Sequence, residues 1–135
     1  MSVALATSTV QRAHAALAHG DREAALSACD PAVRWVVSEG LPFGGVYDGM
    51  LEVASYFEEL GRHFSSLLVS LTEVVATNDV VVEQGTYRGV ARESMIPFEA
   101  RFCVVWQLRD GRVYEVTEYA DTAVLNAAVA PHFTN

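Results

Sequence analysis

From residue 67 to residue 119 the chain consists of four runs rich in β-branched and aromatic residues, with short polar segments between them. The runs are LLVSLTEVVA, VVVEQGTYRGVA, PFEARFCVVWQL and RVYEVTEY, at residues 67–76, 80–91, 97–108 and 112–119. Alternating apolar and polar residues are typical of strands with one buried face, and short polar turns join neighbouring strands antiparallel. This half of the chain therefore predicts an antiparallel meander of four strands.

The rest of the chain has mainly helical spacing. Gly20 follows the first helical stripe as a C-terminal glycine would, and Asp21 can then cap a second, short helix. The expected elements are a helix at 3–19, a helix at 22–29, a strand at 33–38, a helix that begins after Asp48 and a short helix at 121–129. The order predicts an α+β fold with helices on one face of a curved sheet, which can enclose a pocket.

The connection between the first strand and the third helix is unusually long. Its sequence, EGLPFGGVYDG at residues 39–49, holds four glycines and a proline. Structural connections need only a few residues, and long glycine-rich loops are commonly mobile or functional. We expect this loop to close over the pocket as a lid.

Composition limits the class of protein. The 135 residues, of which 51% are hydrophobic and 19% charged, predict one domain spanning residues 1–135. The net charge of -8 disfavours nucleic acid and anionic membrane surfaces as partners. The absence of a secretory-signal pattern and of a long apolar run predicts a cytoplasmic protein with no membrane span. His14 and His19 are five residues apart, so they do not form a helical metal pair, and no metal site is expected.

The predicted hairpin of the last two strands indicates which residues form the pocket wall. A three-residue turn at residues 109–111 would pair Leu108 with Arg112 and Phe102 with Glu118. The residues that would share one face are Ala100, Phe102, Val104, Trp106, Tyr114, Val116, Glu118 and Ala120. A carboxyl in such apolar surroundings loses solvation in its charged form, which suits it to proton transfer. Glu118 is therefore the first catalytic candidate; a register slipped by one residue would instead make it an ordinary solvated acid.

Several segments resemble the nuclear transport factor 2-like superfamily, in its SnoaL-like, ketosteroid-isomerase-related branch. They are GD at residues 20–21, the loop EGLPFGGVYDG, the hairpin WQLRDGRV and the ending EYADTAVL, so the similarity covers nearly the whole chain. The resemblance implies a cone-shaped α+β fold with a deep apolar cavity, and usually a homodimer formed through the outer face of the sheet. It does not imply one function, because related proteins include isomerases, cyclases, epoxide hydrolases, dehydratases and binding proteins.

Two further residues are catalytic candidates by this resemblance. Glu39 lies close to where ketosteroid isomerases carry a proton-shuttling carboxylate, although the loop here is longer. His14 lies near where those enzymes place a phenol, and a neutral imidazole can donate one hydrogen bond and accept another. The alternatives are a solvated acid at the pocket mouth for Glu39 and a hydrogen-bonded core residue for His14.

Seven side chains are expected to form apolar walls around a ligand, with core packing as the alternative reading for the aromatic ones. They are Trp35, Tyr56, Phe57, Phe102, Val104, Trp106 and Val116. The inward positions Phe102, Val104 and Trp106 differ from the oxyanion-hole Asp of ketosteroid isomerases and from the Arg and Asp pair of limonene epoxide hydrolases. Both of those reactions are therefore disfavoured.

Two functional hypotheses remain. In the first, the protein is an enzyme without a cofactor, of cyclase, isomerase or dehydratase type, acting on an apolar and possibly polyketide- or terpenoid-like small molecule. In the second, it is a dimeric binding protein with the same cavity. The enzyme is favoured because a carboxyl inside an apolar pocket costs stability unless it has a partner or a use.

Overall fold

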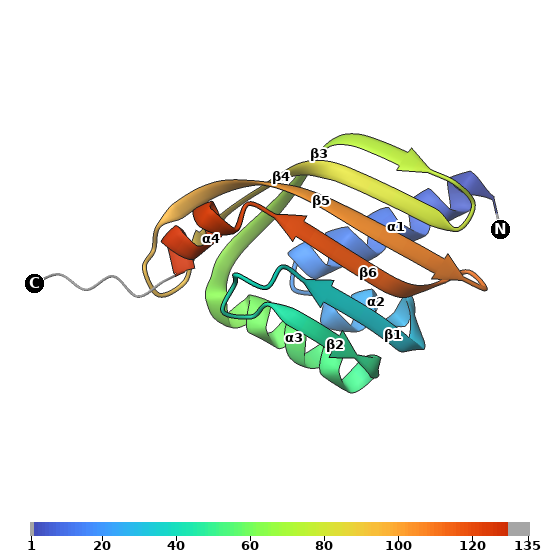
Figure 1. Cartoon of the computed structure of the whole chain (residues 1–135), viewed down its shortest axis with the longest axis horizontal. Helices are drawn as coiled ribbons and strands as arrows, with labels where there is room; N and C mark the ends of the chain where they lie inside the picture. The colour runs from blue at the N-terminus through green and yellow to red at the C-terminus, as the bar shows by residue number, and fades with distance from the viewer. Residues whose placement is uncertain (1, 130–135) are drawn as a thin grey trace, which may run out of the picture.

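Residues 2–129, which the computed structural model describes, form one curved sheet with helices against it (Figure 1). The helices are α1 (Val3–Ala18), α2 (Arg22–Ser27), α3 (Gly49–His63) and α4 (Thr122–Val129). The strands are β1 (Cys29–Val37), β2 (Gly45–Asp48), β3 (Phe64–Ala76), β4 (Val80–Ala91), β5 (Pro97–Arg109) and β6 (Arg112–Ala120). The α+β fold expected from the sequence is confirmed.

The sheet has the strand order β2-β1-β6-β5-β4-β3. The meander from β3 to β6 is antiparallel throughout, as predicted. Two features were not predicted: β1 pairs parallel with β6, and β2 pairs with Arg34–Val37 of β1. Because β2 occupies Gly45–Asp48, the long glycine-rich connection shrinks to residues 38–44.

The helices α1, α2 and α3 lie on one face of the sheet, and α4 packs near the beginning of β5 (Figure 1). Local signals fix the helix ends. Ser2 accepts a hydrogen bond from the Leu5 amide at 3.0 Å, and Gly20 ends the first helical segment with a φ of +77°. Asp21 accepts from the Ala24 amide at 3.1 Å, as its predicted capping role requires.

The β5–β6 hairpin differs from the predicted pairing. Its turn has two central residues, Asp110 and Gly111, both with positive φ, so Arg109 pairs with Arg112. A bulge then adds Tyr114 to β6, and Tyr114 hydrogen-bonds Gln107 on the outer side of the sheet instead of facing inward. The predicted partner of Leu108 was wrong by one residue, and beyond the bulge the predicted partners were wrong by two. An even shift leaves side chains on the same face, so Glu118 still shares a face with its new partner, Val104.

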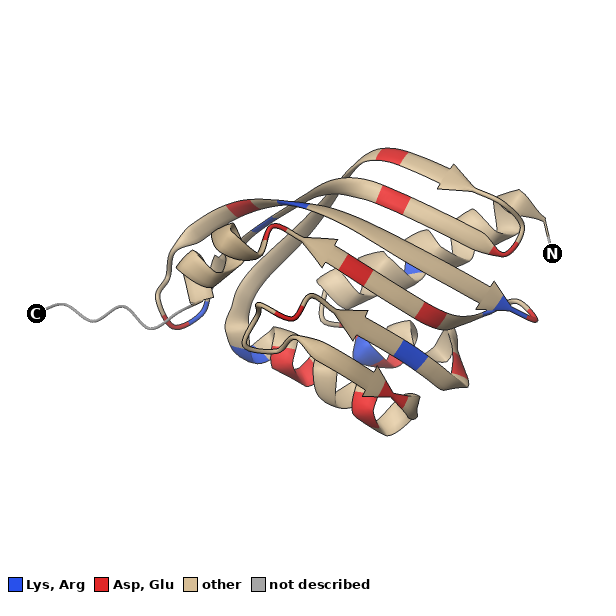
Figure 2. Cartoon of the chain, viewed as in Figure 1, with Lys and Arg blue, Asp and Glu red and all other residues tan. Residues whose placement is uncertain are grey.

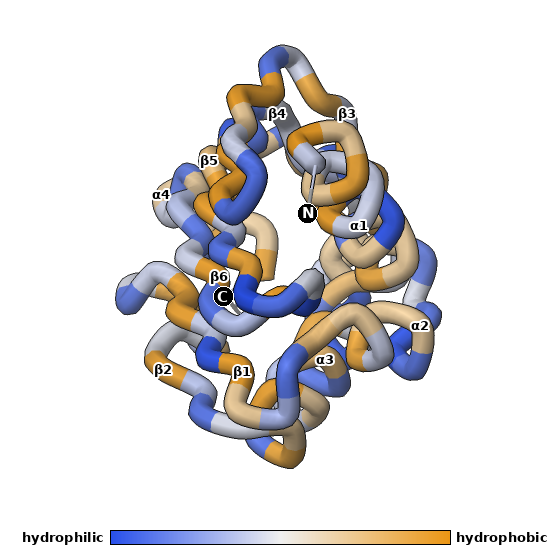
Figure 3. Tube along the Cα trace, turned by 90° about the vertical axis from the view of Figure 1, so that its right-hand side faces the viewer, coloured by the Kyte–Doolittle hydropathy of each residue, from blue (hydrophilic) through white to orange (hydrophobic). Residues whose placement is uncertain are grey.

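The inner face of the sheet and the helices facing it form one core. Buried and less buried positions alternate along β4 and β5. Hydrophobic and hydrophilic segments both occur along the strands of the sheet (Figure 3). Acidic residues are spread over the described helices, strands and loops (Figure 2). Within residues 2–129, no helix is long and apolar enough to cross a membrane.

Candidate functional site

A pocket of about 40 Å³ lies between the helices and the inner face of the sheet. Its apolar lining includes Leu17, Leu41, Phe43, Leu60, Phe64 and Leu125. Its polar side chains are His14, Ser38, Tyr56, Tyr87 and Glu118. Among the described residues that line it, Glu118 is the only carboxyl.

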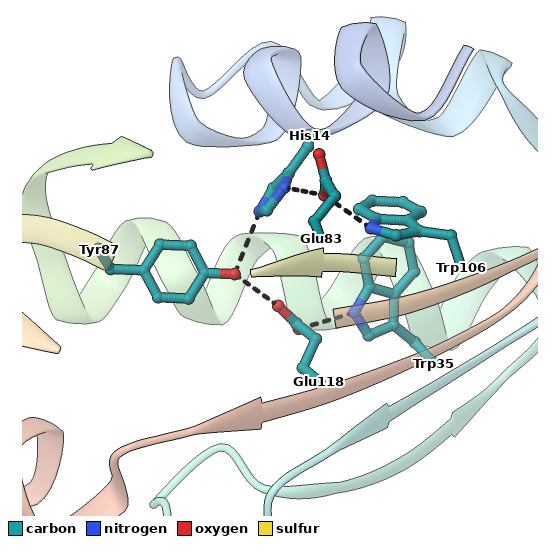
Figure 4. A network of polar contacts seen from close by, with 6 residues as sticks. All are labelled: His14, Trp35, Glu83, Tyr87, Trp106 and Glu118. Atoms are coloured by element: carbon teal, nitrogen blue, oxygen red, sulfur yellow. Dashed lines mark hydrogen bonds and ion pairs between the residues drawn. The ribbon is translucent and has the colours of Figure 1, made fainter. Parts of the chain in front are cut away.

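The Glu118 carboxyl is held by three hydrogen-bond donors from three different elements. The Trp35 indole N–H donates to Oε2 at 2.7 Å, and the Tyr56 hydroxyl donates to the same oxygen. The Tyr87 hydroxyl lies 3.2 Å from Oε1, between Glu118 and His14 (Figure 4). These contacts from three elements fix the position of the carboxyl at the pocket wall.

The two tyrosines remain neutral phenols in this site. Burial raises the pKa of Tyr56 well above its usual value, and the nearby Glu118 carboxyl adds to the rise. The pKa of Tyr87 is raised well above its usual value by burial, then by Glu118, with Glu83 contributing less. Because neither phenol readily loses its proton, each can serve as a hydrogen-bond donor in the pocket.

A second carboxyl, Glu83, lies deeper, below the pocket. It is 0% exposed, its Oε1 is 2.6 Å from His14 Nδ1, and the Trp106 indole N–H donates to the same oxygen at 2.8 Å. The other oxygen, Oε2, has no hydrogen-bond partner within residues 2–129. A buried carboxyl with one orphaned oxygen is costly, so this arrangement needs an explanation.

His14 and Tyr87 join the two carboxyls. His14 Nε2 lies 3.1 Å from the Tyr87 hydroxyl, so a continuous line of hydrogen bonds runs from Glu83 through His14 and Tyr87 to Glu118 (Figure 4). Phe102 supports both middle members: its ring stacks on Tyr87 with centroids 4.0 Å apart and meets His14 edge-on at 5.5 Å. The line is therefore rigid and shielded from water over most of its length.

The loop at residues 38–44 contributes Leu41 and Phe43 to the pocket lining. Side chains outside the loop hold it in place: Asn126 donates to the Gly40 carbonyl at 2.6 Å, and Tyr47 donates to the Phe43 carbonyl at 2.7 Å. At its base, the Ser38 hydroxyl donates to the backbone carbonyl of Glu118 at 3.0 Å. Phe43 also anchors the loop, since it is buried and its ring packs against Tyr56, His63 and Phe64.

The chemistry of the site is that of acids, bases and hydrogen-bond donors. Within residues 2–129, no group of three or more His, Cys, Asp or Glu side chains is placed to hold a metal ion. The pocket instead offers a carboxyl, two phenols and an imidazole against apolar walls. Such a set can move a proton on an apolar molecule and stabilise charge that develops on an oxygen.

Comparison with known families identifies the fold. The family model of the SnoaL-like domain matches residues 10–116, which cover every strand except the last four residues of β6. The chain belongs to the SnoaL-like domain family. Comparison with curated protein sequences finds no match to this SnoaL-like domain.

Solved structures similar to this SnoaL-like domain share its whole fold. An NTF2-like protein of unknown function from Burkholderia pseudomallei K96243 is 25% identical, with a TM-score of 0.88 over 97% of this chain and 100% of that one. An NTF2-like protein from Burkholderia thailandensis E264 is 26% identical, with a TM-score of 0.84 over 97% and 100% of the two chains. TerC, co-crystallised with polyporic acid, is 21% identical, with a TM-score of 0.84 over 94% and 99%.

The structure brings together only some of the residues singled out from the sequence of this SnoaL-like domain. Glu118, His14 and Tyr56 line the pocket. Glu39 is exposed in the loop and does not line it. The other expected wall residues lie in the core and are absent from the pocket lining: Trp35, Phe57, Phe102, Val104, Trp106 and Val116. They pack against one another and against the line of hydrogen bonds from Glu83 to Glu118. The aromatic ones among them fill the space beneath the pocket.

Sequence reasoning missed Glu83. Along β4, residues 81, 83, 85 and 87 alternate onto the inner face, so a count by two from Tyr87 would have placed Glu83 inward. The sheet register puts Glu83, Val104 and Glu118 in one row across β4, β5 and β6. This register, which the sequence did not specify, places the two carboxyls in one row on the inner face of the sheet of this SnoaL-like domain.

Proposed function

We propose that this SnoaL-like domain is an enzyme that works without a cofactor and moves a proton on an apolar small molecule that carries a carbonyl group. Cyclase, isomerase and dehydratase reactions all include such a step. The supporting observation is Glu118, a carboxyl fixed by Trp35, Tyr56 and Tyr87 at the wall of an otherwise apolar pocket. A carboxylate held in this position can act as a base toward a molecule bound in the pocket.

In the first step, Glu118 removes a proton from the carbon next to the carbonyl. The C–H bond breaks, its electron pair forms the enolate, and the proton goes to a carboxylate oxygen of Glu118. The carboxyl returns that proton to another atom of the same molecule in an isomerisation, or to a leaving oxygen in a dehydration. No oxidant or second reactant is needed.

Tyr56 and Tyr87 give this step a source of stabilisation that grows in the transition state. Both hydroxyls donate to Glu118 while it is ionised. Once Glu118 takes up the proton it becomes a weaker acceptor, and the Tyr56 hydroxyl, which lines the pocket, can turn to the developing enolate oxygen. The charge leaves the carboxylate and appears on the substrate oxygen while the donors stay close by.

The pocket favours apolar substrates of modest size, such as polyketide- or terpenoid-like molecules. A volume of about 40 Å³ holds only two or three water molecules, so a ring-sized ligand requires the loop at residues 38–44 to move. The co-crystal of TerC with polyporic acid is a precedent for a small-molecule ligand in this fold.

A binding protein is the second candidate. It is favoured by the fact that Glu118 already has three donors within the protein, which a purely structural carboxyl would also have. In that case the pocket would hold an apolar molecule and the network would only rigidify its wall. The two candidates differ in whether Glu118 exchanges protons with the ligand.

Solvent deuterium separates the candidates. The protein is incubated in heavy water with enolisable apolar ketones, cyclohexanone and 1-tetralone, and deuterium next to the carbonyl is measured by mass spectrometry. We expect the wild type to speed incorporation and Glu118→Gln to lose about 10²–10⁴-fold of that rate while ketone affinity changes little. Glu39→Gln, which removes an exposed carboxyl of the loop, is the matched control and should keep the full rate. Binding without faster exchange by the wild type would favour the binding protein.

A further inference from the structure

We infer that Glu83, His14 and Tyr87 form a proton relay to Glu118, so that the two carboxyls share one mobile proton. The inference deepens the proposed function, since it rests on Glu118 as the acid and base of the pocket. Glu83 is the inner end of the relay and His14 and Tyr87 are its middle members. In this account Glu83 acts on the substrate only through the others, as a positioning residue.

The distance between the carboxyls makes the middle members necessary. Glu83 and Glu118 both pair with Val104, from opposite sides, so two strand spacings of roughly 5 Å each separate their backbones. Within residues 2–129, the two carboxyls form no direct hydrogen bond with each other. His14 Nδ1 and Nε2 and the Tyr87 hydroxyl bridge the gap in three steps of 2.6, 3.1 and 3.2 Å.

Three hydrogen bonds need one proton each, and the network can place three protons in more than one way. With Glu118 ionised, Tyr87 donates to Glu118, His14 Nε2–H donates to Tyr87, and protonated Glu83 donates to His14 Nδ1. With Glu118 protonated, Glu118 donates to Tyr87, Tyr87 donates to His14 Nε2, and His14 Nδ1–H donates to ionised Glu83. Every arrangement contains the same three protons and one net negative charge.

Moving between these arrangements transfers a proton from one carboxyl to the other without changing the total charge of the buried site. A proton leaves Glu118 for the Tyr87 oxygen, the Tyr87 proton passes to His14 Nε2, and the His14 Nδ1 proton passes to Glu83. The raised pKa values of the phenols fit this role, because Tyr87 passes a proton on without a lasting charge. The titratable or hydrogen-bonding groups packed around the line are Tyr56 on α3, Trp35 on β1 and Trp106 on β5.

The relay also explains the orphaned oxygen of Glu83. Oε1 accepts from Trp106 and contacts His14, whereas Oε2 has no partner within residues 2–129. A neutral carboxylic acid tolerates an unpartnered carbonyl oxygen better than a carboxylate tolerates an unpartnered charged one. A group that is neutral in the resting state and ionised only when Glu118 is protonated therefore suits this position.

The variant Glu118→Gln gives a test that needs no substrate, because the orientation of its amide is fixed. Trp35 and Tyr56 both donate to the Oε2 position, so the amide oxygen stays there and the amide N–H group faces Tyr87. Tyr87 must then accept from the amide and donate to His14 Nε2. We expect His14 Nε2 to carry a proton in the wild type and to lack one in Glu118→Gln, although the two residues do not touch.

The measurement is the pair of imidazole ¹⁵N chemical shifts of His14 in the full chain at neutral pH, assigned with His14→Gln. The shift of Nε2 should move from the protonated to the unprotonated range in Glu118→Gln. In a Tyr87→Phe background the same substitution should leave it unchanged, because the link is broken. Glu39→Gln is the control for loss of one negative charge and should match the wild type.

A second variant covers the case in which Tyr87→Phe does not fold. In Glu83→Gln, the Trp106 donor keeps the amide oxygen at the Oε1 position, so His14 must keep its Nδ1 proton. The Nε2 proton should then pass through Tyr87 to Glu118, because this arrangement leaves every member of the buried line neutral. A wild-type Nε2 signal that stays the same in Glu118→Gln and in Glu83→Gln would overturn the relay. The result is independent of catalysis, so the relay and the proposed enzyme can fail separately.

Discussion

At the level of single residues, the proposed proton transfer depends on two carboxyls in different surroundings. Glu118 lies at the pocket wall with three donors, whereas Glu83 is fully buried with His14 and Trp106. Removing one member of a buried charged or strongly polar pair costs more than replacing both, because the remaining group loses its partner. Stability measurements can therefore examine the inner pair without any ligand.

The first prediction concerns the contact between His14 and Glu83. His14→Leu leaves Glu83 with Trp106 as its only hydrogen-bond partner among the described residues, and we expect the free energy of unfolding to fall by about 1–3 kcal/mol. Adding Glu83→Met in the same chain should restore most of that loss, since two apolar side chains then fill the space. Urea unfolding followed by circular dichroism measures both variants. A double variant as unstable as His14→Leu alone would show that the pair contributes packing and little else.

The second prediction concerns stability in alkali. Burial raises the pKa of Tyr56 and Tyr87, so between pH 10 and the folded pKa the unfolded chain loses phenol protons that the folded chain keeps. The free energy of unfolding is unaffected by these groups below pH 10 and should fall above it, by up to about 1.4 kcal/mol per pH unit for each phenol. Because the chain has no lysine, tyrosine and cysteine are the side chains that titrate in this pH range.

Urea unfolding from pH 9 to 11 provides the check. The variant Tyr56→Phe with Tyr87→Phe should lose most of the alkaline dependence, and Tyr119→Phe, which removes an exposed phenol, should keep it. Cys29, whose pKa burial raises to about 12, adds a dependence of the same sign that is common to all three proteins. Equal slopes in all of them would contradict the neutral, buried state of the two phenols.

At the scale of elements, the loop at residues 38–44 is the segment expected to move. We predict that amide hydrogen exchange in this loop is faster than in β1 and slows when 1-tetralone binds, as a closing lid would show. Asn126→Ala removes the bond to the Gly40 carbonyl and should speed exchange further. Exchange that is equally slow in the loop and in β1 without ligand would indicate a rigid connection.

Sequence patterns predicted elements better than they predicted pairings. The β-branched runs and the caps at Gly20 and Asp21 are local signals, and they gave the meander and the first two helices. The parallel contact of β1 with β6 depends on residues far apart in the chain, and β2 is too short and glycine-rich to stand out. The bulge at Tyr114 has no local signature either, because it forms from the fit of β6 to β5.

The candidate site was partly predictable for the same reason. Glu118 and His14 are polar residues in apolar stripes, which a periodic pattern reveals. Glu83 has the same kind of signal along β4, but its importance follows from the row that it shares with Glu118 across three strands. The aromatic residues expected at the pocket wall lie in the core, because periodicity distinguishes inside from outside but does not separate pocket from packing.

At the scale of the whole molecule, the outer face of β5 and β6 is the expected contact of a homodimer. Tyr119 on this face is 58% exposed, and Val105 and Thr117 beside it are partly exposed. We predict a species of about twice the 14.7 kDa chain mass by light scattering at micromolar concentration. Tyr119→Arg, which places a cation against its own copy, should shift the protein toward the one-chain mass. A one-chain mass for the wild type would contradict the dimer.

If Glu118 moves protons on a bound ketone, that transfer next to the carbonyl should be stereoselective. Glu118 is the only carboxyl among the described residues of the pocket lining, so it approaches a bound ketone from one side. In heavy water, the wild type should place deuterium on one of the two prochiral positions of 1-tetralone, and Glu118→Gln should leave only the slow, unselective background exchange. Equal labelling of both positions, or selective labelling that survives Glu118→Gln, would contradict the account.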